Sequence, residues 1–290
     1  MESVINKHKY PRIDTFLYNG ENIVFYRLKY LYDVFDEFVI VESYYTFSGL
    51  KKDELFFNKY IDKFMPYIAK ITLRVIENFP QDLKYKYKYL KDPNVHEYMY
   101  LAYCNCLYQR DYALEYIKYK YIGRNYIVHC SDVDEIPLKD IIKNSNINYE
   151  LLSSPIYLDL IIFYYNCNWN KRFTRRFSFL CNNRCLLNMS FTYIRNIAPI
   201  AEASYYRFAG WHFSYFQTPE EIIFKFKSSI YKNGDEPNPK LFDNEYIKNC
   251  IDNGLHLYDF DNNNIHEKLF KFENIRKIEL PPNMDELNLN

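Results

Sequence analysis

Two kinds of hydrophobic pattern alternate along the chain and outline its secondary structure. Short, dense apolar runs rich in β-branched and aromatic residues are typical of buried strands, and they fall at residues 12–18, 37–42, 68–76, 126–130, 156–166 and 205–216. Apolar residues spaced three or four apart predict helices at 21–35 and 95–121, with a short helix after Pro137. Thr218 and Glu221 have the spacing of a capping box, which predicts a helix to about Lys227.

This order of elements predicts an α/β fold in which helices cover both faces of a mostly parallel sheet. No Pro-, Gly- or Ser-rich linker is long enough to separate two domains. We therefore expect one main domain over residues 1–236, with one half at about 10–150 and another at about 151–236. Residues 237–290 are expected to form a helical tail packed on this domain.

Two groups of charged residues are interpreted from their local context. The stretch 166–188 is polar and basic, and we interpret it as a loop. Its Arg175 and Arg176 either reach a phosphate in bidentate fashion or are exposed. Glu21 and Arg27 are interpreted as structural, a helix-start acid and a basic partner on the same helix.

The most informative segment is residues 126–137, where an apolar run ends in three acidic residues before Pro137. The run is typical of a buried parallel strand. Asp132 and Asp134 then lie at its carboxyl end, where ligands bind in open α/β sheets. Two carboxylates one residue apart can share a divalent cation, which prefers oxygen ligands and can carry a diphosphate. The alternative is a solvated strand end whose acids cap the next helix.

Composition narrows the classes of function. The 290 residues carry 37 basic and 37 acidic side chains, so no basic surplus favours binding to nucleic acid. Tyrosines beside a cleft can bind sugar faces, because their rings are apolar with a polar tip. Seven scattered cysteines are expected to be buried thiols, which suits a reducing compartment. No stretch approaches the roughly 20 apolar residues of a membrane span, so a soluble, cytoplasmic protein is expected.

Several spaced motifs occur in an order that resembles one known family. They are residues 13–21 (IDTFLYNGE) with Arg27, 39–43 (VIVES) with 46–49 (TFSG), Gln109 and Arg110, 131–137 (SDVDEIP), 209–214 (AGWHFS), Phe224 and Lys225, and 233–235 (NGD). In this order they resemble glycosyltransferase family 17, the family of the bisecting β-1,4-mannosyl-glycoprotein N-acetylglucosaminyltransferase. The match runs over about residues 12–236, and the tail beyond Pro237 matches poorly. Ordered motifs are far more specific than any single one.

The resemblance implies a GT-A-type nucleotide-sugar-binding fold, with the nucleotide in the half at 10–150 and the acceptor in the half at 151–236. It implies a metal-dependent, inverting glycosyltransferase that moves a sugar, usually N-acetylglucosamine from UDP-GlcNAc, onto a hydroxyl of a glycan or glycoprotein with β linkage. Mn²⁺ or Mg²⁺ would be the cofactor. An interpretation from a different class is a non-catalytic carbohydrate- or nucleotide-binding module derived from such a fold, and the intact acids argue against it.

Candidate residues for the donor nucleotide come from two strands and the long helix. Asp14 on the first strand and Glu42 at the end of the second are expected to bind uracil or ribose. The alternative for both is a buried pair with Arg27 or Arg110, since charges inside a sheet need partners. Phe16 and Arg110 are placed in the donor site by the resemblance.

The cation and the sugar have candidates of their own. Asp134 is expected to bind the cation directly, and Asp132 to hold the ribose or a metal-bound water. His212, as a neutral imidazole, is expected to complete the metal shell; the alternative is a satisfied core histidine. Trp211 is expected to wall the sugar pocket, with plain core packing as the alternative. Glu135 is expected to position the loop or to lie behind the metal ligands.

An inverting transfer needs a base for the acceptor hydroxyl and stabilisation of the leaving diphosphate. The acidic candidates for the base are Asp235, Glu236, Glu220 and Glu202. We expect Asp235, which lies in the matching NGD motif; its alternative role is an Asx-type turn after Gly234. Lys225 is expected to neutralise the departing phosphate, and the alternative is a solvated helix surface.

Overall fold

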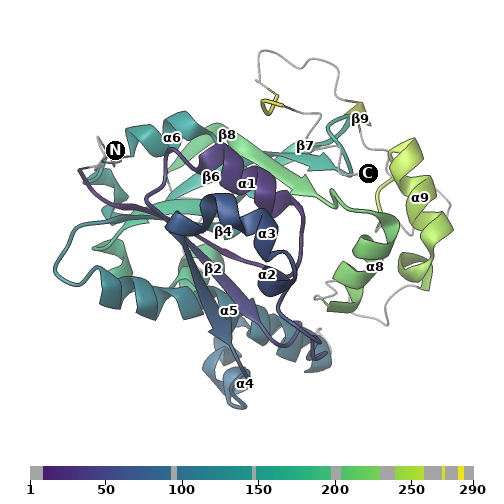
Figure 1. Ribbon diagram of the computed structural model, residues 1–290, viewed down its shortest axis with the longest axis horizontal. Helices are drawn as coiled ribbons and strands as arrows, with labels where there is room; N and C mark the ends of the chain where they lie inside the picture. Colours follow the sequence, from purple (N-terminus) through teal and green to yellow (C-terminus); the bar gives the residue numbers. More distant parts are fainter. Residues whose placement is uncertain are drawn as a thin grey trace.

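The structure is a computed structural model of the chain. It describes residues 9–92, 97–145, 148–196, 204–228, 239–257, 270–271 and 280–283, with the backbone alone for 171–177 and 270–271. A large central sheet crosses the molecule, and helices lie on both of its faces (Figure 1). This arrangement confirms the predicted α/β class. Across the described ranges, no helix combines the length and the apolar character that crossing a bilayer requires.

The strands of the described residues form one mixed sheet. Its order is β3-β2-β1-β4-β7-β6-β8-β5, with β9 beside β7. Pairs β1–β2, β1–β4, β2–β3 and β6–β8 are parallel, whereas β7 and β5 run against their neighbours, so most strands share one direction. The strands are β1 Arg12–Leu17, β2 Glu37–Ser43, β3 Ile71–Ile76, β4 Ile127–Asp132, β5 Glu135–Pro137, β6 Ile156–Tyr164, β7 Trp169–Asn182, β8 Tyr205–Ser214 and β9 Phe270–Lys271.

The prediction of a loop at residues 166–188 is wrong. Most of that stretch is β7, which pairs antiparallel with β4 on one side and β6 on the other. An antiparallel strand needs an apolar residue only at every second position, and Phe177, Phe179 and Cys181 have that spacing in the sequence. The dense positive charge of the stretch obscures this period.

The helices of the described residues are α1 Ile23–Leu31, α2 Phe56–Lys59, α3 Ile61–Phe64, α4 Leu83–Lys86, α5 Glu97–Lys120, α6 Lys139–Asn144, α7 Phe191–Asn196, α8 Pro219–Ser228 and α9 Asn244–Asn253. Of these, α1, α5, α6 and α8 lie in stretches predicted as helices, and α9 lies in the expected helical tail, whereas α2, α3, α4 and α7 were not predicted. The predicted capping box is present at the start of α8, where the Thr218 backbone N–H donates to Glu221 Oε2 (3.0 Å) and the Glu221 N–H donates to Thr218 Oγ1 (3.3 Å). This box fixes where α8 starts.

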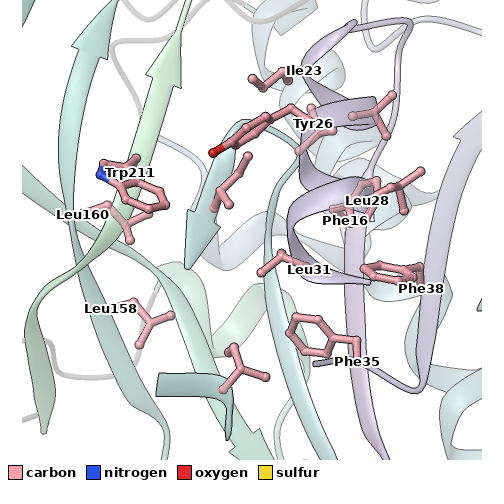
Figure 2. Packing of buried hydrophobic residues seen from close by; sticks show 14 of the residues in the cluster. Phe16, Ile23, Tyr26, Leu28, Leu31, Phe35, Phe38, Leu158, Leu160 and Trp211 are labelled. Carbon is pink, nitrogen blue, oxygen red and sulfur yellow. The ribbon is translucent and has the colours of Figure 1, made fainter. Parts of the chain in front are cut away.

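Apolar clusters hold the layers together. On one face of the sheet, α1 packs against β6 and β8, and its Tyr26 and Leu31 point toward Trp211 and Leu160 (Figure 2). Leu28 lies on the other side of α1, beside Phe16 and Phe38. On the other face, α5 covers β1, β2 and β4, and a third cluster joins α8 and α9 to the end of β6. The cysteines of the described residues are free thiols, and all but Cys106 are buried, as predicted.

The connection from β4 to β5 fixes the position of residues 132–135, the acidic segment, which contains Asp132, Asp134 and Glu135. Only Val133 and Asp134 separate the two strands in the chain, yet β7, β6 and β8 lie between them in the order of the sheet. β5 pairs antiparallel with β8, and Pro137 lies opposite Gly210. A Cβ at Gly210, whose φ is +154°, would approach the Ile136 carbonyl oxygen to 2.2 Å, so this close approach needs glycine. The acidic segment thus bridges two distant strands of one sheet.

Candidate active site

Asp132, the last residue of β4, is held by two arginines. Arg110 of α5 donates to its Oδ1 (2.8 Å), and Arg195 of α7 donates to its Oδ2 (2.5 Å). Arg195 also donates to both oxygens of Glu135, at 2.8 and 3.0 Å. The Asp132 side chain nevertheless keeps 36% of its surface exposed, whereas Arg110 keeps 5% and Arg195 8%. The carboxylate therefore presents one open edge in front of two buried cations.

The charges around Asp132 fix its ionisation. Burial opposes the charged form, but Arg110 and Arg195 outweigh it and hold the pKa of Asp132 well below its usual range. The pKa of Arg195 is raised, because Asp132 and Glu135 more than offset the effect of burial. Asp132 is accordingly an anion at neutral pH.

Asp134 lies in a second, looser group. Lys225 Nζ of α8 is 3.3 Å from its Oδ2, and His212 Nε2 of β8 is 3.6 Å from its Oδ1. Burial works against ionisation, yet Lys225 and His212 hold the pKa of Asp134 well below its ordinary value. The pKa values of His212 and Lys225 are raised in turn by Asp134, against the effect of their own burial. The structure thus brings together three of the predicted residues, from a strand connection, a strand and a helix.

A divalent cation would find a partial set of donors in this second group. The contacts of Asp134 are longer than the about 2.7–2.9 Å of a tight charge-assisted hydrogen bond, and a carboxylate with an imidazole suits Mn²⁺-type ions. Within the described ranges, no three His, Cys, Asp or Glu side chains are grouped to hold an ion by themselves. Phosphate oxygens and water would have to supply the other ligands, as is usual for such cations. Asp132 fits a cation less well, because each of its oxygens accepts from an arginine.

Arg27 of α1 holds the backbone of the acidic segment in place through hydrogen bonds made in the protein interior. It donates to both oxygens of Asp14 (2.6 and 2.8 Å), to Ser131 Oγ (2.7 Å), and to the carbonyls of Asp132, Val133 and Glu135 at 2.9, 3.2 and 2.8 Å. Its side chain is fully buried. The sequence suggested a partner on the same helix, but the structure gives Arg27 partners on β1 and around the end of β4.

Asp14 belongs to this buried network. His129 Nδ1 is 2.8 Å from Asp14 Oδ1, and His129 Nε2 is 2.7 Å from Ser178 Oγ. The order Asp–His–Ser has the connectivity of a nucleophilic triad, but all three residues have no exposed surface. A substrate cannot reach this hydroxyl, so the arrangement joins β1, β4 and β7. For Asp14 the structure therefore shows the buried pair with Arg27 that was the alternative.

Glu42 at the end of β2 is also fully buried. It pairs with Lys52 (3.1 Å) and accepts from the backbone N–H groups of Phe56 (2.7 Å) and Phe57 (3.0 Å) at the start of α2. Its partner is thus neither Arg27 nor Arg110. Burial raises the pKa of Glu42 more than Lys52 lowers it. The Glu42 side chain therefore anchors the segment between Lys52 and the start of α2 to the end of β2.

Trp211 and Phe16 lie in the interior. Trp211 is 2% exposed and makes an edge contact with Tyr30, with ring centroids 5.6 Å apart; Figure 2 shows it beside Leu160 in the core. Phe16 is equally buried, and the Arg27 guanidinium lies 4.4 Å above its ring. These positions correspond to the core-packing alternative for Trp211, and they place Phe16 beneath the arginine that orders the acidic segment.

The candidate bases fall mostly outside the described residues. Asp235, Glu236 and Glu202 lie there, and Glu220 is exposed on the first turn of α8. The side chains of Arg175 and Arg176 are likewise not described, although their backbone belongs to β7. Sequence reasoning missed Arg195 altogether. Its only signal would have been the position of a basic residue in the stretch that forms the short helix α7.

The geometry can be compared with known families. The family model described as glycosyltransferase family 17 matches residues 5–279. The chain belongs to glycosyltransferase family 17. A search among curated proteins found no significant match.

Membership of family 17 makes the protein a glycosyltransferase, with a sugar donor and an acceptor as its substrates. Nucleotide sugars are the donors that such a family suggests. The family match also corrects the expected extent of the resemblance, because it continues past Pro237 to residue 279. The tail, including α9, is therefore part of the family region.

Proposed function

We propose that this family 17 enzyme transfers a sugar from a UDP-sugar, UDP-GlcNAc in the simplest case, onto a glycan hydroxyl with inversion. The observation that carries the proposal is the position of Asp134. It lies beyond the carboxyl end of β4, between Lys225 of α8 and His212 of β8. This edge is where open α/β sheets bind ligands. The nucleotide is proposed to occupy the half at residues 10–150, and the acceptor the half at 151–236.

Lys225 is the proposed partner of the leaving diphosphate. Its ammonium is charged, because Asp134 more than offsets its burial and raises its pKa. Asp134 and His212 would hold a divalent cation, Mn²⁺ or Mg²⁺, through oxygen and nitrogen donors. When bound, such a cation supplies Lewis-acid stabilisation of the developing charge on the diphosphate. Lys225 would stabilise the same charge from α8.

Asp132 and Arg110 are the proposed contacts of the ribose. The open edge of Asp132 can accept hydrogen bonds from sugar hydroxyls while the arginines keep it ionised. Arg110 Nε and Nη1 are buried without a hydrogen-bond partner in the described part of the chain. Buried unpaired donors are costly, and a ligand or an ordered water commonly satisfies them. This supports a place for Arg110 beside the donor.

Inversion requires in-line attack from the face opposite the leaving group. The acceptor oxygen would bond to the anomeric carbon as the bond from that carbon to the diphosphate breaks, and UDP would leave. Asp235 is the proposed base for the hydroxyl proton; it lies in the NGD motif, which follows α8 in the sequence, and α8 carries Lys225. A carboxylate with an ordinary pKa is ionised at neutral pH.

A donor screen tests the proposal. UDP-GlcNAc, UDP-glucose, UDP-galactose and a GDP-sugar are incubated with the purified chain and mixed glycans, with Mn²⁺ or with a chelator, and released nucleotide is measured. UDP release that depends on Mn²⁺ and is highest with UDP-GlcNAc is expected. Thermal shift with UDP, GDP and CMP provides a readout independent of turnover. Stabilisation by free glycans alone, without nucleotide release, would instead indicate a binding module.

A further inference from the structure

Arg195 links the two halves of the protein at the acidic segment. It lies on α7, in the half at 151–236, whereas Asp132 and Glu135 belong to the other half. One arm of its guanidinium donates to Glu135 (2.8 Å), and the other donates to both Asp132 (2.5 Å) and Glu135 (3.0 Å). The Asp132 backbone N–H also donates to Glu135 Oε2 (2.9 Å). The three residues therefore form a closed ring of hydrogen bonds.

The anchor of this ring is rigid. Glu135 is 1% exposed and begins β5, which is paired with β8. Helix α7 is itself fixed on α5, because Thr192 donates through its backbone N–H to Asp111 Oδ1 (2.9 Å) and through Oγ1 to the Leu107 carbonyl (3.0 Å). Asp132 is thus held between a buried carboxylate and a docked helix, while its side chain stays 36% exposed.

We propose that Arg195 is a positioning residue that sets the orientation of Asp132 for the donor, so that donor affinity depends on the docking of α7. The inference rests on the proposed donor site. The fork of Arg195 binds both oxygens of Glu135, and one arm of it also donates to Asp132 Oδ2. Because Glu135 fixes the plane of the guanidinium, that donor approaches Asp132 from a set direction, whereas a lysine would supply only a point charge.

The experiment compares Arg195→Lys and Arg195→Gln with the wild type in the full-length chain. Calorimetry measures the Kd for UDP, and steady-state kinetics measure KM for the donor, KM for the acceptor, and kcat. We expect both variants to lose about 10- to 100-fold in UDP affinity, the same scale as the loss when a residue that orients a metal ligand is removed. The acceptor KM should stay unchanged, and the lysine variant should resemble the glutamine variant despite its charge.

Arg184→Gln is the matched control, because Arg184 forms an exposed ion pair with Glu150 that is remote from the acidic segment. Thermal unfolding of each variant separates folding from positioning, and the lysine variant carries the test if the glutamine variant does not fold. Wild-type affinity for UDP in a folded Arg195→Lys would overturn this inference alone. If the wild type itself fails to bind UDP, the proposed donor is overturned and this inference with it.

Discussion

Two clusters of carboxylates lie at opposite ends of parallel strands in the same sheet. They differ in the number and length of the hydrogen bonds that their oxygens accept. At the amino end of β2, Glu37 accepts four short hydrogen bonds, from Thr72 (2.6 Å), Tyr116 (2.8 Å), Lys120 (2.8 Å) and Tyr121 (2.7 Å). Its side chain is 5% exposed. At the carboxyl end of β4, Asp132 keeps an open edge and Asp134 has only contacts of 3.3 and 3.6 Å. The first cluster is saturated, and the second can still accept a ligand.

This difference suggests that the Glu37 cluster serves the stability of the fold, whereas Asp132 and Asp134 serve the binding of a ligand. Charge-assisted hydrogen bonds that are short and buried fix neighbouring strands and helices, and Glu37 joins β2, β3 and α5 in this way. Long contacts in a mostly buried site leave charges that a ligand can satisfy better than the protein does. Substitutions at the two ends should therefore affect different measurements, which the following predictions test in order of decreasing expected effect.

Replacement of Arg27 should have the largest effect. Arg27→Met leaves Asp14 buried without its cation, and breaking a buried pair in this way costs about 3–5 kcal/mol of unfolding free energy. It also frees the carbonyls of Asp132, Val133 and Glu135, so turnover should fall as well. Urea unfolding measures the loss, and Arg184→Gln, an exposed arginine, serves as control. A loss of unfolding free energy below about 1 kcal/mol would contradict the structural role of the buried Arg27.

Asp134→Asn should lower kcat/KM by about 100- to 1,000-fold, the scale of removing one electrostatic contact at a reacting group. The unfolding free energy should fall as well, because Lys225 and His212 lower the pKa of Asp134 and so stabilise its charged form in the folded state; turnover is therefore expressed per folded protein. Nucleotide release and urea unfolding give the two numbers. Asp140→Asn, an exposed acid on α6, is the control. If turnover persists while stability drops, Asp134 belongs with Glu37 and not with the site.

Glu37→Gln should lose about 1–3 kcal/mol of stability at pH 7, because it weakens four buried hydrogen bonds, and turnover by the folded fraction should be unaffected. Burial raises the pKa of Glu37, but Lys120, Thr72, Tyr121 and Tyr116 outweigh it and lower that pKa. The stabilisation is therefore present above the unfolded pKa of about 4.3 and is lost as the pH falls through the lower folded pKa.

Urea unfolding from pH 7 to pH 3 checks this, and the two curves should converge at the acid end. The exposed Glu54→Gln serves as control. A gap between wild type and Glu37→Gln that stayed constant with pH would show that ionisation of Glu37 does not contribute.

Thr218→Ala should have the smallest effect. Loss of the capping box costs about 1 kcal/mol, and because α8 carries Lys225 to Asp134, a slight rise in the donor KM should accompany it. Thr218→Ser keeps the capping oxygen and should restore both values. Equal stability of the alanine and serine variants would show that the cap does not fix the start of α8.

Local sequence signals predicted much of the fold. The dense apolar runs located β1, β2, β4, β6 and β8, and the Thr218–Glu221 spacing located the start of α8. What failed depends on pairing in space. The strand β7 was hidden by its charge, and β3 begins at Ile71 because residues 65–70, with Pro66 near the start, form a 3₁₀ helix instead. The three-residue β5 has no pattern of its own and exists because β8 provides its partner.

For the candidate site, the sequence indicated which acids matter but not their partners. Asp134, His212 and Lys225 were all selected, and the structure places them together. Arg195 was missed because it is 63 residues from Asp132, and ion-pair partners at that distance follow from how α7 docks. The burial of Glu42 against Lys52 and of Trp211 under Tyr30 depends on packing in the same way.

The short link between β4 and β5 has a consequence for how the protein is made. Both aspartates are synthesised long before residues 205–214, yet β5 is held by pairing with β8. A nascent chain that stops short of β8 would contain every acid of the segment without the strand that shapes it. Contacts so distant in sequence form slowly. The acidic segment should therefore take its final shape only after residues 205–214 have been synthesised and β8 has paired with β5.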